Sequence, residues 1–196
     1  IKIDCGEFLG EGATPDAREA QQFVGSEIEV VSDYEVRGYS KVRGGWNNGS
    51  AYTVYFSAVF NKPISSFATF KNGQLFASQK VQVDDGKKTG VLLYFTDTEA
   101  GEIEMKIGIS FISSLKAKQN IDKEIPHWSF EKTLQETRDS WENLLKKIEI
   151  DNSASPDQQK MFYTALYHTM LMPVDRTGEN PGWENNAPYY DDFYAI

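Results

Sequence analysis

Cysteine and histidine are scarce in this chain of 196 residues. It has one cysteine, Cys5, and two histidines, His127 and His168. A single cysteine excludes an internal disulfide and any cysteine-based metal site, and it leaves the redox compartment open. The two histidines are too few and too widely spaced to form a metal-binding pair. We therefore expect both histidines to be structural.

The chain also has no extended cluster of lysine and arginine. Its formal net charge is −9 at pH 7, and basic residues gather only in short runs such as Lys87-Lys88. A partner with a phosphate backbone requires a basic surface, so the composition argues against nucleic acid. No apolar run is long enough to span a membrane, and neither an initiator methionine nor a secretory signal is present. We expect an internal piece of a longer protein, with its targeting signal outside the chain.

Motifs for phosphate binding, calcium-loop binding, zinc proteolysis and serine-nucleophile hydrolysis are missing from the sequence. What the chain does have is apolar material, with 40% hydrophobic and 13% aromatic residues. That is enough for a folded core, so the chain is globular and not intrinsically disordered.

From Glu27 to Ser110 the apolar residues follow a period of two. Short β-branched and aromatic runs such as EIEVV, SAYTVYFSAVF and GVLLYF are separated by turn sequences that include Asn72-Gly73 and Asp85-Gly86. This spacing predicts an antiparallel β-sandwich. The bulk on both faces of Tyr52 to Val59 predicts a strand covered on both sides. Residues 1–25 carry no clear pattern, so the sequence does not decide their secondary structure.

After Ser113 the apolar period changes to 3.6 residues. The sequence predicts a short helix capped by Ser114 and ended by Pro126, then a longer helix from about Phe130 to Lys147 with Ser129 at its N-cap. The longer helix has one apolar stripe, so we expect it to lie on a surface and to link two domains.

The last predicted helix begins at Pro156 and ends near Leu171. Ser155 and Gln158 are spaced as a capping box around the first-turn proline, and Pro173 limits the far end. The helix is apolar on two adjacent faces, which predicts neighbours on several sides. The preceding sequence does not obviously supply those neighbours.

The loop that follows Pro173 is rich in carboxylates and aromatic rings. Carboxylates and guanidinium groups bind hydroxyls, and flat rings offer a face to the C–H side of a sugar, so this mixture is typical of a carbohydrate pocket. An acidic loop whose aromatic residues pack on a core would have the same composition. The residues concerned are Asp175, Arg176, Glu179, Trp183, Glu184, Tyr189, Tyr190, Asp191, Asp192, Phe193 and Tyr194.

The order of these elements predicts a mainly β fold with helices. We expect a β-sandwich over residues 1–112, incomplete at its start, a helical linker over residues 113–153, and the beginning of an α-helical domain over residues 154–196.

Several long segments resemble glycoside hydrolase family 92, the calcium-dependent α-mannosidases. They are MFYTALYHTMLMPVDRTGENPGW, PYYDDFYAI, IGISFISSLKAKQNIDKEIPHWSF and WENLLKKIEI. The resemblance runs from roughly Tyr34 onward. It implies an N-terminal β-sandwich, linker helices and the start of an (α/α)6 catalytic barrel, with the glycan bound where the domains meet.

The resemblance also implies an inverting hydrolase that removes terminal α-linked mannose from glycans, with calcium as cofactor. In the family, the general acid, the general base and the calcium ligands lie downstream of the segment that ends this chain. No residue here is therefore assigned as catalytic or metal-binding, and the chain alone is expected to be inactive. Trp183, Tyr190, Asp191 and Asp192 are expected near the sugar.

The resemblance implies further partners and a location. The chain's partners are then mannose-containing glycans and the remainder of its own catalytic domain, and the location is periplasmic, cell-surface or secreted. Two alternatives stay open from the residues themselves. One is a carbohydrate-binding β-sandwich that uses Trp46 and Tyr39, and the other is a purely structural module that braces a catalytic barrel.

Overall fold

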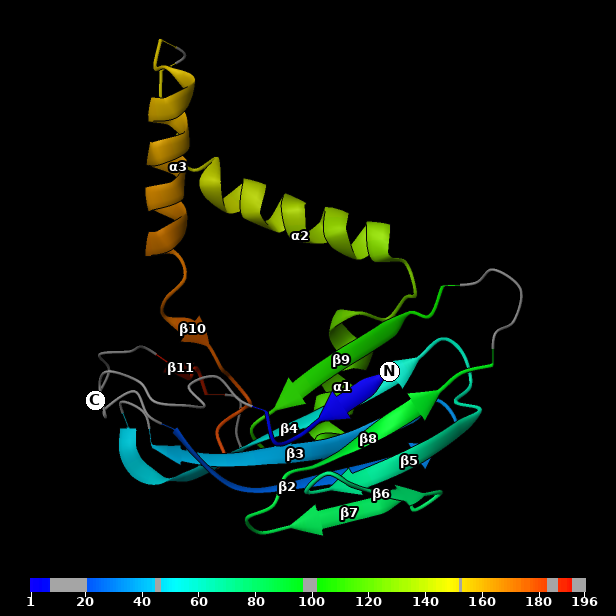
Figure 1. Ribbon diagram of the computed structural model, residues 1–196. Coiled ribbons are helices and arrows are strands. Elements are labelled where there is room, and N and C mark those ends of the chain that lie inside the picture. Colours follow the sequence, from blue (N-terminus) through cyan, green and yellow to red (C-terminus); the bar gives the residue numbers. More distant parts are fainter. Residues whose placement is uncertain (8–20, 45–46, 97–101, 152, 183–186, 192–196) are drawn as a thin grey trace. The chain divides into compact units, whose positions relative to one another are not determined.

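The computed structural model describes residues 1–7, 21–44, 47–96, 102–151, 153–182 and 187–191. The chain divides into two compact units, Ile1–Trp128 and Ser129–Ile196. The first is built on strands and the second on helices (Figure 1). The domain limits expected from the sequence, 1–112, 113–153 and 154–196, stay a prediction.

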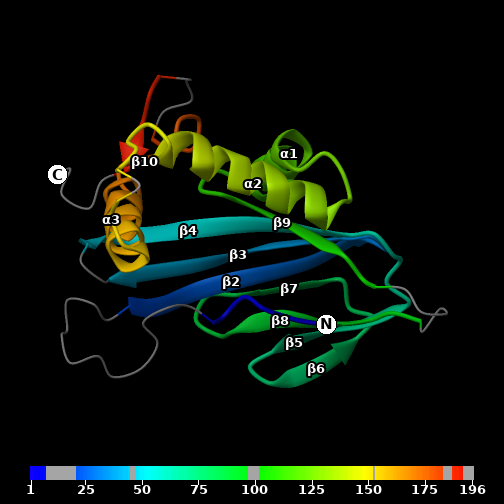
Figure 2. The ribbon, with the colours of Figure 1, turned by 90° about the horizontal axis from the view of Figure 1, so that it is seen from above.

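The first unit is an antiparallel β-sandwich of two sheets. The larger sheet has five strands in the order β7-β2-β3-β4-β9, and the smaller sheet has four in the order β1-β8-β5-β6. Figure 2 shows the two sheets from above. The strands are β1 (Lys2–Asp4), β2 (Gln21–Ser32), β3 (Glu35–Gly44), β4 (Asn47–Phe60), β5 (Ser66–Lys71), β6 (Gln74–Ala77), β7 (Val81–Asp84), β8 (Thr89–Tyr94) and β9 (Met105–Ser110). The β-sandwich expected from the period of two is confirmed.

Alternate residues of the two sheets meet to form one hydrophobic core. In the pairs Val30↔Val36 and Val36↔Ala58, adjacent strands place apolar side chains on the same face, as the pleat requires. The core is completed by the smaller sheet and by the start of the chain. Its buried members are Cys5, Ile28, Val30, Val36, Ala58, Phe60, Ile64, Val91 and Leu93.

Buried polar groups at one part of the sandwich are hydrogen-bonded between the two sheets. The hydroxyls of Ser26 and Thr89 lie 2.8 Å apart, and the Thr89 N–H donates to Ser26 Oγ at 3.0 Å. Nearby, Gln82 Nε2 donates to Thr69 Oγ1 at 3.3 Å. Because an unpaired buried polar group is costly, this pairing lets four polar residues occupy the interior without loss of stability.

Two strands of the β-sandwich, β1 and β6, were not predicted from the sequence. Strand β1 lies in the region with no clear pattern, and it is recognisable only by its pairing with β8. Strand β6 is short and forms a hairpin with β5 through Asn72 and Gly73, both with positive φ. That turn was expected, since an Asn-Gly pair adopts this conformation readily, but the strand beyond it is mostly exposed and has no apolar alternation.

Helix α1 (Ser114–Glu124) packs against the outer face of the larger sheet. Ala117 and Ile121 are its buried residues, and they face the strand position of Gly108. The N-cap is Ser113, whose hydroxyl accepts from the Lys116 N–H, so the expected cap at Ser114 was wrong by one residue. Leu115, expected on the apolar stripe, is exposed.

The second unit contains α2 (Phe130–Leu145), α3 (Pro156–Thr169), β10 (Val174–Asp175) and β11 (Tyr190–Asp191). Ser129 caps α2 as predicted. The capping box of α3 is also confirmed, because Gln158 N–H donates to Ser155 Oγ at 3.3 Å and Ser155 N–H donates to Gln158 Oε1 at 2.9 Å. Both helices end about two residues earlier than expected, a common discrepancy at helix termini.

Helices α2 and α3 meet through the rings of Trp141 and Tyr167, whose centroids lie 4.8 Å apart. Neither helix has a buried residue within the described part of the chain. Large apolar side chains such as Phe130 and Met161 remain exposed, so this unit provides few of the neighbours that two apolar faces require. Within the described residues, no helix has the length and apolar character needed to cross a bilayer.

Candidate functional site

The loop after α3 is held by a two-residue ladder between β10 and β11. Val174 pairs with Asp191 and Asp175 pairs with Tyr190. The Arg176 N–H extends the ladder by donating to the Tyr189 carbonyl at 2.7 Å. The chain thus returns on itself, and it brings the predicted sugar-binding residues at 190 and 191 beside the start of the loop.

A hydrogen-bonded turn fixes the start of this loop. The Thr177 N–H donates to Asp175 Oδ1 at 2.9 Å, and the Tyr189 N–H donates to Thr177 Oγ1 at 3.2 Å. The hydrogen bonds from the Thr177 side chain and backbone lower the pKa of the Asp175 carboxyl. Asp175 is therefore ionised at neutral pH and positions the backbone that leads to Tyr190.

Of the four predicted substrate-binding residues, Tyr190 and Asp191 lie on β11. The Tyr190 side chain is 53% exposed, which leaves it available to a ligand. Trp183 and Asp192 lie outside the described residues. The assignment of all four residues to a sugar site stays a prediction.

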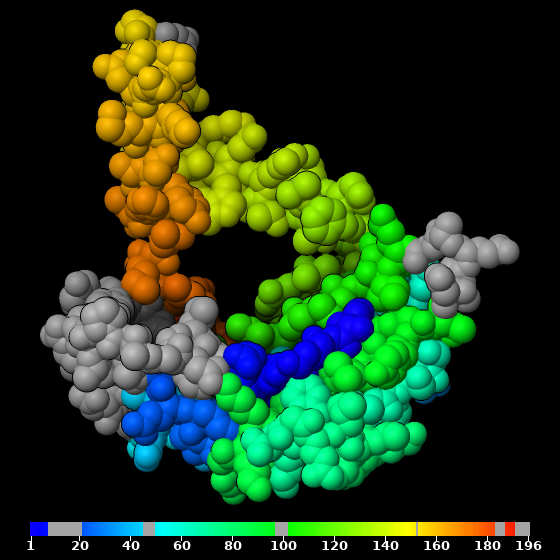
Figure 3. Space-filling model, in the orientation of Figure 1, coloured from blue at the N-terminus to red at the C-terminus, as the bar shows by residue number. Residues whose placement is uncertain are grey.

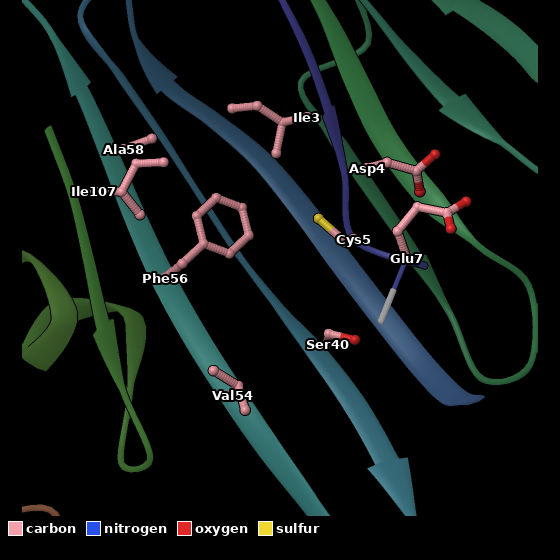
Figure 4. A pocket seen from close by; sticks show the side chains of 9 residues that line it. All are labelled: Ile3, Asp4, Cys5, Glu7, Ser40, Val54, Phe56, Ala58 and Ile107. Carbon is pink, nitrogen blue, oxygen red and sulfur yellow. The ribbon is translucent and has the colours of Figure 1, made fainter. Parts of the chain in front are cut away.

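The β-sandwich contains a pocket of about 220 Å³ that sequence reasoning did not find. In Figure 4, Ile3 and Cys5 lie on one side of the pocket, and Phe56, Ala58 and Ile107 lie on the other. Asp4, Glu7, Ser40 and Val54 complete the lining. These residues come from four separate segments, so no local motif could have indicated the pocket.

The pocket is built for apolar contact more than for chemistry. Burial, with a smaller contribution from the Asp4 carboxylate, raises the pKa of the Cys5 thiol to about 12. The thiol is thus protonated at neutral pH and is not an activated nucleophile. Within the described residues, the buried Ser40 hydroxyl has no hydrogen-bond partner.

The thiol of Cys5 is expected to be inert in the folded chain. At pH 8 the reaction with 5,5′-dithiobis(2-nitrobenzoate) should be at least about 100-fold slower than in 6 M guanidinium chloride, because burial blocks access and suppresses the thiolate. Absorbance at 412 nm measures the rate. A native rate equal to the denatured rate would contradict the buried position of Cys5.

The alternative sugar platform on the β-sandwich involved Trp46 and Tyr39. Trp46 lies outside the described residues. Tyr39 is half-buried and packs edge to face on Tyr55, with centroids 5.7 Å apart and planes at 65°. Burial raises the pKa of the Tyr39 hydroxyl. The two rings do not form one flat stacking surface.

The described residues do not fit a metal site. Within them, no three side chains of histidine, cysteine, aspartate or glutamate gather closely enough to hold an ion. Calcium takes six to eight oxygen ligands, so no part of a calcium-dependent reaction can be derived from these residues.

Solved structures of similar fold are glycosidases. The family GH92 α-mannosidase BT3965 from Bacteroides thetaiotaomicron matches with a TM-score of 0.72 and 24% identity, over 87% of this chain and 24% of that chain. It has also been solved in complex with mannoimidazole. The GH92 inverting mannosidase BT2199 from Bacteroides thetaiotaomicron VPI-5482 matches with a TM-score of 0.69 and 21% identity, over 86% of this chain and 24% of that one.

A protein of Arthroderma benhamiae, described as an uncharacterized secreted glycosidase, is 36% identical over 114 residues. The match covers 56% of this chain and 15% of the fungal protein. The chain therefore spans only a small part of the length of the proteins it resembles.

Two family models match consecutive parts of the chain. Residues 4–110 match the N-terminal domain of glycosyl hydrolase family 92, and residues 116–195 match the catalytic domain of the same family. The first match lies in the β-sandwich and the second includes the loop that carries Tyr190. On the strength of both matches, this chain belongs to glycosyl hydrolase family 92.

Proposed function

We propose that this chain is part of an exo-acting α-mannosidase that removes terminal α-linked mannose from glycans with inversion of configuration. The observation that carries the proposal is the consecutive match to both domains of glycosyl hydrolase family 92. Two similar solved structures are described as an α-mannosidase and as an inverting mannosidase, which supports both the substrate and the stereochemistry.

Within that enzyme, the chain supplies scaffold and the rim of the sugar pocket. The exposed ring of Tyr190 offers an apolar face to a pyranose, and the β10–β11 ladder sets its position. Carboxylates at 191 and 192 would accept hydrogen bonds from sugar hydroxyls. An inverting glycosidase needs an acid and a base roughly 6.5 to 9.5 Å apart, with the attacking water between them, and we assign neither to this chain.

We propose calcium dependence for the full-length parent protein, meaning the protein that contains these 196 residues. The support is the resemblance of the long segments to a calcium-dependent family. Among the described residues no three histidine, cysteine, aspartate or glutamate side chains gather closely enough to hold an ion, and we propose that the calcium ligands lie elsewhere in the parent protein.

The proposed location is outside the cytoplasm, either periplasmic, at the cell surface or secreted. Support comes from the Arthroderma benhamiae relative, which is described as secreted.

The parent protein should hydrolyse an α-mannoside and lose that activity on treatment with EGTA. Proton NMR of the first product should show β-mannose, because inversion at the anomeric carbon of an α-mannoside yields the β anomer. Addition of calcium should restore the rate. Initial release of α-mannose would contradict inversion, and full activity in excess EGTA would contradict calcium dependence.

A further inference from the structure

The inner face of β9 carries an uncovered apolar strip. Met105, Ile107 and Ile109 occupy alternate positions and are 41%, 50% and 55% exposed. Their register partners on the neighbouring strand β4 are Phe60, Ala58 and Phe56, whose side chains lie on the core face of the sheet. This strip therefore continues the interior of the sandwich into solvent.

Among the described residues β1 is the last strand of the smaller sheet, so that sheet stops short of this strip. Ile1 exchanges backbone hydrogen bonds with Leu93, and the Cys5 N–H donates to the Thr89 carbonyl. In an antiparallel pair, intervening residues point their backbone groups the other way. The N–H and C=O groups of Lys2 and Asp4 thus face away from β8, along an edge that no described strand pairs with.

The edge of β9 that does not pair with β4 is less available for pairing with an added strand. Asn120 Nδ2, on α1, donates to the Ile109 carbonyl at 2.9 Å. Between the two edge strands lies the pocket of about 220 Å³, with Ile3 of β1 on one side and Ile107 of β9 on the other. Figure 3 shows the start of the chain, in blue, along the surface of the unit next to the green strands.

We propose that an extended segment of the parent protein, outside these 196 residues, pairs with the open edge of β1 and covers the strip on β9. A strand added to β1 would lie about 4.8 Å beyond it, and packed sheets lie about 10 Å apart. Its alternate side chains would therefore meet Met105, Ile107 and Ile109, which recur every second residue. One apolar side chain of the segment would fill the pocket beside Ser40.

An extended strand fits these residues better than a helix. Backbone groups of Lys2 and Asp4 offer ladder hydrogen bonds, which a helix cannot accept because its own are used internally. An open apolar edge also promotes aggregation, and proteins commonly cover it. We assign the segment to the same protein because this chain matches only 24% of the α-mannosidase BT3965. The rest of a parent protein of similar length could supply the added strand. In this respect the inference rests on the proposed function.

The test compares Ile107→Asp with Leu75→Asp in both the 196-residue chain and the parent protein. Leu75 is the matched control, because it is 56% exposed on the outermost strand at the other end of the smaller sheet. In the 196-residue chain, both variants should reduce soluble yield by less than about twofold, as exposed positions do. In the parent protein, Ile107→Asp should reduce soluble yield about tenfold or more, and Leu75→Asp should not, since only Ile107 would be buried there.

Hydrogen exchange supplies a second readout that does not depend on activity. The Asp4 amide should exchange at least about tenfold more slowly in the parent protein than in the 196-residue chain, because the added strand would protect it. Equal exchange together with equal tolerance of both variants would overturn the inference. Dimerisation of the 196-residue chain that Ile107→Asp abolishes, with the variant tolerated in the parent, would show a second copy on the strip and would also overturn it. A parent protein inactive on α-mannosides would refute the proposed function without changing either readout.

Discussion

Replacing Gly108 by valine is expected to lower the free energy of unfolding of the β-sandwich by about 3 kcal/mol. A Cβ atom at this position would lie 2.2 Å from the Ala117 carbonyl oxygen and 2.7 Å from Ile121 Cγ1. The first is a backbone atom, so α1 would have to move away from β9. That movement would expose Ala117 and Ile121, which are buried against the sheet.

Urea unfolding followed by circular dichroism near 215 nm measures this loss. Ile109→Val, on the opposite face of the same strand, is the control, and its side chain is exposed. The control should change the free energy of unfolding by less than about 0.5 kcal/mol. Equal stability of the two variants would mean that α1 does not pack closely on Gly108.

Separating the two units should give one folded and one unfolded polypeptide. Residues 1–128 contain the whole hydrophobic core and are expected to unfold cooperatively. Residues 129–196 contain the helices α2 and α3, of 16 and 14 residues. Among the described residues, neither helix has a buried side chain. Because isolated helices of this length are marginal in water, their helical signal should fall below about one third of the value expected from the structure.

Circular dichroism at 222 nm distinguishes the outcomes for residues 129–196. Caps at Ser129 and Ser155 favour helix formation locally, but each contributes only about 1 kcal/mol. Full helicity with a sharp thermal transition would show that this unit is stable without further neighbours. That result would contradict the interpretation of α3 as the beginning of a larger helical domain.

Local signals predicted most of the fold. The period of two and the Asn72-Gly73 turn indicated the strands, and the Ser155-Gln158 spacing indicated the capping box of α3. Strand β1 was not predictable, because its conformation depends on pairing with β8, more than eighty residues later in the chain. Ser113 replaced Ser114 as the cap because either serine satisfies the same local rule.

The candidate sites were less predictable. The loop composition directed attention to Tyr190, whose assignment to a sugar site stays a prediction, and only the pairing of Asp175 with Tyr190 shows how the backbone of that residue is held. The pocket and the strip on β9 depend on which strand ends each sheet. Neither Ile3 nor Ile107 differs in sequence context from an ordinary core residue, so the pocket between them appears only in the tertiary structure.

We propose that these residues are the scaffold of an α-mannosidase whose reactive groups lie elsewhere in the parent protein. The most direct test is a side-by-side assay of mannose release from an α-mannoside by the 196-residue chain and by the parent protein, at equal molar concentration with calcium present. We predict release by the parent protein and none above the uncatalysed rate by the 196-residue chain. Release of mannose by the 196-residue chain alone would contradict the account.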